Sequence, residues 1–350
     1  MFNRLGLSVY LSTFDIQKEM LERFEGRGYY VFTSFHIQEE YRKMGNYKRK
    51  AREICNWLKE RQFKIMADVS SKTLEFFQYD SIIEFAKDME IDVLRLDYGF
   101  SEEEILNIAK EYPLSFNPST EGRNIAKDIV ESGKEVFALH NFYPRPETGL
   151  DPDDFIQIND ELRDLGIEPL AFIAGDEMKR GPIHEGLPSL EKHRDIPPYV
   201  AYLDLFINYG IKGIFVGDVM ISQRQSQLID DYIEDGIINI PVEFLPKYEY
   251  LYDQVFTIRA DSPKAMMRLQ ESREYSNDGE KTQGFNCITR KKGSITMDNA
   301  GYKRYSGEIQ ILRKDLPQDN RVNVIGSLDN GYLDIMNCVE NKRKIRFIKG

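Results

Sequence analysis

The segment 140–150 concentrates chemically active side chains in a single short stretch. It reads His-Asn-Phe-Tyr-Pro-Arg-Pro-Glu-Thr-Gly-Leu, and the apolar run 136–139 directly before it is typical of a buried strand. Two prolines flank Arg145 and restrict the backbone there, since proline fixes φ near about −65°. We therefore interpret 140–150 as a stiff loop that presents an imidazole, an amide, a phenol and a guanidinium, and such loops often carry function.

Polar residues also follow other apolar runs in the first two thirds of the chain. These residues are His36, Asp68, Asp97, Asn117, Asp176, Arg180, Glu185 and Asp218. Paired carboxylates at strand ends are what glycoside hydrolysis requires, because one must be protonated to release the leaving oxygen while the other is ionised. The environment of each carboxyl group would separate the two pKa values.

Structural roles are the alternative for several of these residues. Asp97 and Asp218 are also suited to capping the helix that follows each strand. His36 is equally compatible with a packed, hydrogen-bonded imidazole. Arg145 has Glu147 and Asp151 nearby in sequence as partners for a surface ion pair.

Other catalytic chemistries lack the residues they need. The chain has no glycine-rich phosphate loop, no Gly-x-Ser-x-Gly motif, no cysteine at a strand end and no lysine ending a barrel strand. Its three cysteines and four histidines show no metal-type spacing, so we expect neither a bound metal nor a cofactor. The widely spaced cysteines favour a reducing compartment.

Predicted strands and helices alternate regularly over residues 1–236 and carry these residues. Apolar runs predict eight strands at 5–10, 30–34, 64–69, 93–97, 114–117, 136–140, 169–174 and 213–216. Amphipathic stretches between and after them predict helices at 17–27, 47–61, 81–89, 102–112, 122–132, 153–165, 201–209 and 222–234. Eight such units predict a (β/α)8 TIM barrel, and a doubly wound sheet of eight strands is the rival architecture.

Residues 237–350 have a different pattern and predict a small β-barrel-like domain. Short alternating segments separated by Asn and Gly turn signals predict strands at 284–289, 307–312, 321–325 and 344–348. The one helix expected in this domain spans 264–273.

Charge and hydropathy exclude several classes of partner. The net charge of −11 argues against nucleic-acid binding, which depends on neutralising phosphates. Residues 1–235 carry a balance of −15 and residues 236–350 a balance of +4. No apolar stretch reaches the ~20 residues of a membrane span, and the first residues lack the features of a signal peptide. We therefore expect a cytoplasmic protein without membrane contact.

Several longer motifs resemble the bacterial 6-phospho-N-acetylmuramidase family, formerly an uncharacterised "outer surface protein" group. They lie at 66–70, 94–100, 116–120, 140–150 and 180–194, with further likeness at 302–311 and 321–326. The resemblance implies a TIM barrel followed by a cyclophilin-like β domain. It also implies cytoplasmic hydrolysis of N-acetylmuramic acid 6-phosphate β-1,4-linked to N-acetylglucosamine, in peptidoglycan recycling.

We assign roles to individual residues by combining this resemblance with the strand-end positions. Asp97 and Asp176 are the expected catalytic pair, by analogy with barrel glycosidases that use the ends of strands four and seven, with Asp68, Asp218 and Glu185 as the further candidates. For the two anionic groups of the substrate we expect arginine, whose planar fork matches carboxylate and phosphate. The expected substrate-binding residues are His36, Asn117, His140, Asn141, Tyr143, Arg145, Arg180, Asp218 and Arg321.

Two other functions remain open at this level. One is a non-catalytic protein that binds or senses a sugar phosphate, and the other is a different phospho-sugar enzyme on a TIM barrel, such as a lyase. Retention, inversion and acetamido assistance are equally compatible with the sequence, and so is assembly into a homo-oligomer.

Overall fold

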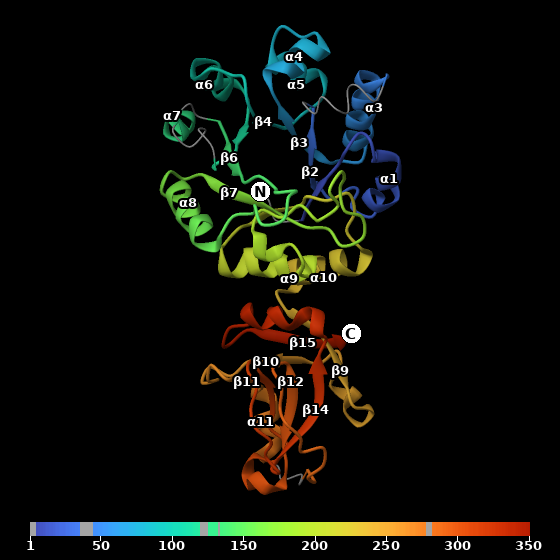
Figure 1. The fold of residues 1–350 in the computed structure, drawn as a ribbon, viewed down its shortest axis with the longest axis vertical. Helices are drawn as coiled ribbons and strands as arrows, with labels where there is room; N and C mark the ends of the chain where they lie inside the picture. Colours follow the sequence, from blue (N-terminus) through green and yellow to red (C-terminus); the bar gives the residue numbers. More distant parts are fainter. Residues whose placement is uncertain (1–4, 36–44, 120–124, 132–133, 278–281) are drawn as a thin grey trace. The chain divides into compact units, whose positions relative to one another are not determined.

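Eight parallel strands in the first part of the chain close into a barrel (Figure 1). This computed structural model describes residues 5–35, 45–119, 125–131, 134–277 and 282–350. Each strand pairs with the next in chain order, and β8 pairs with β1 to complete the ring. The predicted TIM barrel is confirmed, and the doubly wound sheet is excluded. The strands are β1 Gly6–Ser8, β2 Tyr30–Ser34, β3 Lys64–Val69, β4 Val93–Leu96, β5 Leu114–Phe116, β6 Val136–Leu139, β7 Glu168–Ile173 and β8 Gly213–Val216.

An apolar cluster fills the barrel interior. Its members come from six of the strands and are rich in aromatic rings: Tyr30, Phe32, Met66, Val93, Phe137, Leu139, Leu170, Phe172 and Phe215. Successive side chains of a strand point to opposite faces, so only alternate residues reach this interior. The residues between them face the surrounding helices, and this is why most of the strands read as largely apolar runs.

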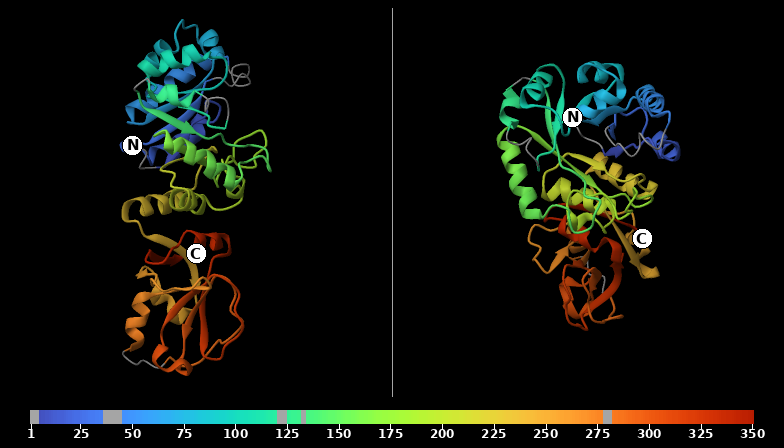
Figure 2. Two further views of the ribbon diagram at one scale, coloured as in Figure 1. Left: turned by 90° about the vertical axis from the view of Figure 1, so that its left-hand side faces the viewer. Right: turned by 45° about the horizontal axis from the view of Figure 1, so that its top comes forward.

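Helices surround the barrel (Figure 2). The described ones are α1 Phe14–Glu22, α3 Tyr47–Glu60, α4 Ser71–Phe77, α5 Ile82–Asp88, α6 Glu102–Glu111, α7 Ala126–Glu131, α8 Pro152–Asp164, α9 Pro198–Leu203 and α10 Gln223–Asp235. Local sequence explains several of their starts. Ser101 and Glu104 form a capping box at α6, and proline occupies the first turn of α8 and α9. The sequence prediction omitted α4, and it placed the first helix three residues too late.

The chain forms two compact units, residues 1–227 and 228–350. The predicted boundary after residue 236 falls at the end of α10. The second unit contains a seven-stranded sheet in the order β10-β15-β9-β14-β12-β13-β11. Its strands are β9 Ile238–Phe244, β10 Val255–Thr257, β11 Met266–Arg268, β12 Ser294–Asp298, β13 Ile309–Leu312, β14 Val322–Leu328 and β15 Lys344–Lys349, and its α-helix is α11 Gln270–Asn277.

Two elements predicted for the second unit are wrong. The segment 284–289 is not a strand, because Asn286 has a φ of 45° and Ile288 bonds back to the Asn286 carbonyl. Residues 264–273 are not one helix, since β11 occupies their centre and α11 begins only at Gln270. The sequence prediction also omitted β9, β10, β11 and β12, although the runs of β9 and β12 are apolar at every second position.

Within the described residues, no helix has both the length and the apolar character needed to cross a membrane.

Candidate functional site

A polar layer lies directly above the apolar cluster of the barrel, toward the C-terminal ends of the strands. Two residues further along β3, β4 and β6 from the core members Met66, Val93 and Leu139, the chain places Asp68, Arg95 and Asn141. The two-residue period of a strand directs these three side chains to the same interior. Along these three strands the barrel interior therefore changes from apolar to polar within two residues.

Arg95 forms hydrogen bonds to both other side chains of this layer. Its Nη1 donates a hydrogen bond of 2.8 Å to Asp68 Oδ1, and its Nη2 donates to Asn141 Oδ1 and, at 3.4 Å, to the carbonyl of Leu139. Arg95 and Asp68 are register partners on adjacent strands, and their side chains are only 4% and 10% exposed. A buried charge pair of this kind requires good geometry, because both ions have lost their water.

Arg95 is the residue that the sequence interpretation missed. Its signal was present, since it is the one charged residue in the otherwise apolar β4, Val93–Leu96. It also lies in the same alternation phase as Asp97. A charge that interrupts a buried strand in the inward phase is a better indicator of a site than a charge in the loop beyond it.

A cavity of about 580 Å³ opens at the ends of β4 and β5. Its polar lining includes Asp97, Ser115 and Asn117. Its apolar lining includes Tyr98, Phe116, Ile105 of α6 and Ile129 of α7, so the cavity also borders the helix layer. Asp97 and Tyr98 are exposed, whereas Asn117 is buried and accepts a hydrogen bond of 3.1 Å from the Ser119 amide. The structure thus places two of the predicted site residues, a carboxylate and an amide, around one cavity of a size typical for small-molecule ligands.

Asp176 follows β7 and is exposed. Its Oδ1 accepts a hydrogen bond of 2.9 Å from the Ser222 amide, just before α10. It is not among the residues that line the cavity at β4 and β5. The structure therefore presents Asp97 and Asp176 at two different strand ends of the barrel.

Asp218 organises the loop after β7. Its carboxylate accepts hydrogen bonds from the backbone amides of Gly175, Arg180 and Leu187, at 2.8, 2.9 and 3.1 Å. Burial nevertheless raises the pKa of this carboxyl group, against the opposing effect of these amides. This packing gives Asp218 a role in shaping the loop.

Arg180 lies on that same loop and stacks on an aromatic ring. Its guanidinium carbon is 3.9 Å from the ring centroid of Tyr10 and 5.9 Å from that of Phe142, which packs on the apolar cluster. Burial raises the pKa of Tyr10 to about 12. The stacking holds the guanidinium plane in place, as binding of an anion in two-point fashion requires.

Residues of the segment 140–150 face two different sides, the barrel interior and the helix layer. Asn141 points into the barrel, and half-buried Tyr143 has a pKa raised by burial and lowered in part by Ser119 and Arg95. His140 is completely buried, with Nε2 at 2.8 Å from Asn159 Oδ1 of α8. Burial lowers the pKa of His140 to about 4. This packing against the helix layer separates His140 from the substrate-binding role that we predicted for it.

Glu191 fixes the far end of the same loop. Its carboxylate accepts hydrogen bonds from the Glu147 and Gly149 amides, at 2.9 and 2.8 Å, and it pairs with both ends of the Arg194 guanidinium at 2.6 Å. Arg194 and these amides lower the pKa of Glu191 to about 2. A Cβ at Gly149 would lie 2.6 Å from Glu191 Oε2, so no other residue fits there without movement.

The remaining predicted residues are dispersed. Arg145 and Glu185 are exposed on the loops after β6 and β7, and the described ion pairs do not include either of them. His36 lies outside the described residues. Arg321 belongs to the second unit, where it forms a two-point pair with Asp319 at 2.8 and 2.9 Å and stacks on Tyr302. In the described part of the chain, no three His, Cys, Asp or Glu side chains are grouped as metal ligands.

Comparison with known proteins gives a consistent result over the whole chain. Two family models match it, "6-phospho-N-acetylmuramidase, N-terminal" at residues 5–231 and "6-phospho-N-acetylmuramidase, C-terminal" at residues 238–348. A conserved Enterococcus faecalis protein of unknown function is 26% identical, with a TM-score of 0.85 over 99% of this chain and 96% of that chain. An uncharacterized B. cereus protein is 22% identical and shares the fold, with a TM-score of 0.78 over 99% of both chains. No curated protein matches the chain.

Proposed function

This chain belongs to the 6-phospho-N-acetylmuramidase family, and we propose that it hydrolyses the β-1,4 bond between N-acetylmuramic acid 6-phosphate and N-acetylglucosamine. The observation that carries this proposal is the cavity at the ends of β4 and β5, which is lined by Asp97 and Asn117. Active sites of TIM barrels lie at this end of the strands.

In the proposed mechanism, Asp97 is the carboxyl group nearest the reaction. It directly follows β4, lines the cavity and is exposed to solvent. Asp176 is the proposed second carboxylate, and Glu185 the reserve on the exposed loop after β7. The two groups divide the work of protonating the leaving oxygen and of stabilising or attacking the sugar carbon.

We propose that the polar layer of Asp68, Arg95 and Asn141 positions the sugar and does not transfer protons. Arg95 fixes Asp68 and Asn141 in the barrel interior, next to Ser115, its own register partner in β5, which also lines the cavity. Fixed polar groups of this kind bind hydroxyl or amide groups without having to reorganise. Asn117, Asn141 and Tyr143 are the proposed contacts of the hydroxyl and acetamido groups.

The phosphate and the lactyl carboxylate require cations in a barrel of net charge −15. Arg180, held by its stacking on Tyr10, and Arg145, exposed on the loop after β6, are the proposed ligands. Arg321 of the second unit remains a further proposal. An imported and phosphorylated cell-wall fragment is the natural source of such a substrate, so we place the activity in the cytoplasm and in peptidoglycan recycling.

Discrimination between phosphorylated and unphosphorylated disaccharide tests this proposal. We expect hydrolysis of the phosphorylated disaccharide, and a kcat/KM lower by about 10²-fold or more on the form without phosphate, because charge-assisted hydrogen bonds are lost. Arg180→Gln and Arg145→Gln should each be assayed on both substrates, with Arg49→Gln, at an exposed site on α3, as the control. The variant that lacks the true phosphate ligand will lose activity on the phosphorylated substrate and keep its activity on the form without phosphate. An equal loss on both substrates for both variants would contradict the assignment.

A further inference from the structure

One face of the sheet in the second unit is polar and largely buried. Arg268 of β11 and Thr296 of β12 both pair with Gln310 of β13, and Asp298 continues the same phase of β12. The alternate residues of these strands, such as Met267 and Ile311, form the buried apolar face. A sheet face that buries charges instead of apolar groups needs a specific reason, because charged side chains are rarely buried.

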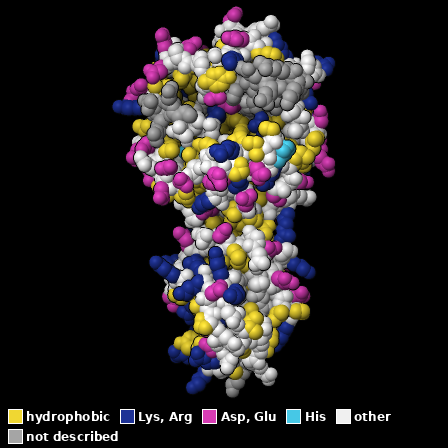
Figure 3. All heavy atoms as spheres, viewed as in Figure 1, with side chains coloured by type: hydrophobic (Ala, Val, Ile, Leu, Met, Phe, Trp, Pro, Cys, Tyr) yellow, Lys and Arg dark blue, Asp and Glu magenta, His cyan; other side chains and the backbone are white. Residues whose placement is uncertain are grey.

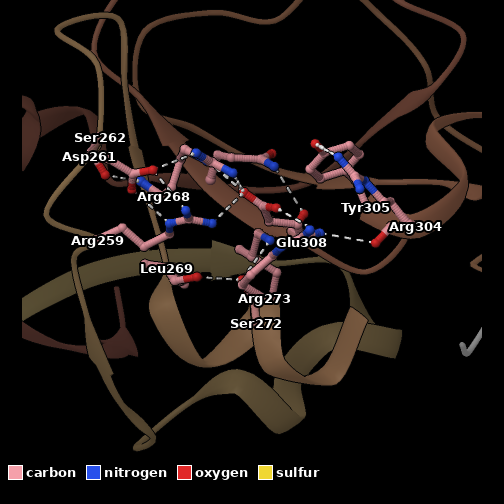
Figure 4. A network of polar contacts seen from close by, with 12 residues as sticks. Arg259, Asp261, Ser262, Arg268, Leu269, Ser272, Arg273, Arg304, Tyr305 and Glu308 are labelled. Carbon is pink, nitrogen blue, oxygen red and sulfur yellow. Dashed lines mark hydrogen bonds and ion pairs between the residues drawn. The ribbon is translucent and has the colours of Figure 1, made fainter. Parts of the chain in front are cut away.

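Glu308, directly before β13, is the centre of this face (Figure 4). Its side chain is only 1% exposed, and three arginines surround it. Arg268 Nε donates to Oε1 at 2.6 Å, and Arg268 Nη2 lies 2.5 Å from the same oxygen. Arg259 Nη1 lies 3.8 Å from Oε1, and Arg273 Nη1 lies 3.6 Å from Oε2. Asp261 also accepts two hydrogen bonds from Arg259, at 2.9 and 2.8 Å, so the three guanidinium groups face two carboxylates, of which Glu308 is the buried one.

Two buried polar atoms of this cluster lack hydrogen bonds within the described structure. They are Oε2 of Glu308 and Nη1 of Arg259. Leaving a buried polar atom unsatisfied is costly, and in native proteins such atoms usually have a water or a ligand as their partner. An unused acceptor and an unused donor therefore lie within one buried cluster.

A cavity of about 260 Å³ is lined by Glu308 and Arg268 of this cluster, but not by Arg259. Its lining combines Glu308, Asp298, Gln310 and Arg290 with the side chains of Tyr302 and Tyr305. Burial and the nearby Glu308 raise the pKa of Asp298 to about 7, so this group is available both to donate and to accept a hydrogen bond. Carboxyl, amide and phenol groups on one small cavity match the alternating donors and acceptors of a sugar ring.

Arg290 adds a cation to this lining. Its Nε donates a hydrogen bond of 2.9 Å to the Pro317 carbonyl, and none of the ion pairs formed by the described residues includes it. Residues 236–350 hold 19 Lys and Arg against 15 Asp and Glu, and the space-filling view shows dark-blue side chains gathered on this unit (Figure 3). A bare anion would be repelled by Glu308 and Asp298, whereas a ligand with both hydroxyls and one anionic group meets each lining group with its complement.

We propose that the cavity bordered by Glu308, Asp298 and Arg290 binds an anionic monosaccharide, that is, a single sugar bearing a phosphate or a carboxylate. Its hydroxyl groups face Glu308, Asp298 and Gln310, and its anionic group faces Arg290. The cavity is smaller than the ~300–1,000 Å³ of most ligand sites, which fits one sugar ring and not two. This binding site does not depend on the activity proposed for the barrel.

Calorimetric titration of the full chain tests this proposal. The probes are glucose 6-phosphate, N-acetylglucosamine 6-phosphate and glucuronate, with glucose and inorganic phosphate as the neutral and the sugar-free comparison. We expect at least one anionic sugar to bind with a Kd below about 1 mM, and glucose and inorganic phosphate to bind at least about ten-fold more weakly. No binding of any anionic sugar up to about 10 mM overturns the proposal, and so does equally tight binding of inorganic phosphate.

Matched variants locate the site. Arg290→Gln should weaken the binding by about ten-fold or more, because a charge-assisted contact is lost. Arg343→Gln, at a half-exposed arginine elsewhere in the same unit, should leave the Kd unchanged. If Arg290→Gln binds like the wild type, or if Arg180→Gln removes the binding, the ligand lies elsewhere and the proposal is wrong.

Proton uptake provides a second readout. An anion bound near Asp298 raises the pKa of that group further above 7, so binding at pH 7 should take up protons from the buffer. Titrations in PIPES and in Tris, which differ in ionisation enthalpy, measure this uptake. Asp298→Asn should abolish it, and a difference between the buffers that persists in Asp298→Asn contradicts the proposed placement of the ligand.

Discussion

Arg95 and Asp68 form a buried ion pair on neighbouring strands of the barrel, with Nη1 and Oδ1 2.8 Å apart. Asn141 accepts a further hydrogen bond from the same guanidinium, so three strand ends are connected at the level where the interior turns from apolar to polar. Pairs of this kind contribute little net stability compared with apolar residues, but they are costly to break from one side. The pair is therefore better explained as a device that sets the position of polar groups.

Removing only one partner of this ion pair should destabilise the barrel. We expect Arg95→Ala to lower the free energy of unfolding by about 3–5 kcal/mol, because Asp68 is left charged and buried. Removal of both partners, in Arg95→Ala with Asp68→Ala, should cost less than the sum of the two single changes. Urea unfolding measures this coupling, and Arg49→Ala, in an exposed pair with Glu53, is the control with an effect below about 0.5 kcal/mol. Additive effects of the two single changes would contradict the account.

Asp97→Asn should abolish most of the activity and preserve the fold. Loss of a catalytic carboxylate costs about 10²–10⁴ in kcat, whereas the amide keeps nearly the same shape. Asp176→Asn should behave likewise, and Asp160→Asn, on the exposed face of α8, should retain full activity. Turnover of the phosphorylated disaccharide measures the effect. If Asp97→Asn and Asp176→Asn both retain more than about a tenth of the wild-type rate, the assigned pair is wrong.

Gly149→Ala should loosen the loop that follows β6. The added Cβ would lie 2.6 Å from Glu191 Oε2 and 2.7 Å from the Glu191 amide nitrogen, so the contact between the two loops must open. We expect a loss of about 1–3 kcal/mol in unfolding free energy, and a rise in KM, since Asn141 and Tyr143 lie on the same loop. Gly45→Ala is the matched control, because no atom lies within 4 Å of its added Cβ. Equal effects of the two substitutions would show that the close approach at Gly149 is unimportant.

His140 should make the stability of the protein depend on pH. Burial lowers its pKa to about 4, below the ~6.5 of an exposed histidine, so the unfolded chain takes up a proton first as the pH falls. This contribution is fully present above about pH 6.5, and it is lost progressively between there and about pH 4, by about 3 kcal/mol. Urea unfolding between pH 7 and 4 should therefore show a smaller decrease in His140→Gln than in the wild type. The same change at exposed His184 should leave the decrease intact, and identical pH profiles for His140→Gln and wild type would refute this explanation.

The barrel was predictable from the sequence because its strands are buried on both faces. Runs such as 136–139 and 170–173 are continuous and apolar, and helical patterns separate them at regular intervals. In the second unit, β12 alternates apolar Ile295 and Met297 with polar Thr296 and Asp298, and the sequence prediction overlooked this short run. Asn286, with its positive φ, shows how one residue can end a run that otherwise resembles a strand.

The candidate site was predictable only in part. Strand ends predicted the positions of Asp97, Asn117 and Asn141, because the barrel geometry brings these ends to one face. His140 and Asn141 face opposite sides, since neighbouring residues in a strand alternate, and a sequence pattern alone did not distinguish the inward from the outward residue. Arg95 was missed because its partners Asp68 and Asn141 are 27 and 46 residues away in the chain, and the sequence contains no record of that contact.

The most direct test of the central claim follows the disaccharide itself by proton NMR. The wild-type protein, incubated with N-acetylmuramic acid 6-phosphate β-1,4-linked to N-acetylglucosamine, should release both monosaccharides in equal amounts, and the anomer formed first distinguishes retention from inversion. Asp97→Asn, folded as judged by circular dichroism, should leave the disaccharide intact over the same period. Recovery of intact disaccharide with the folded wild-type protein would contradict the proposed hydrolysis, and undiminished release by Asp97→Asn would contradict the proposed site.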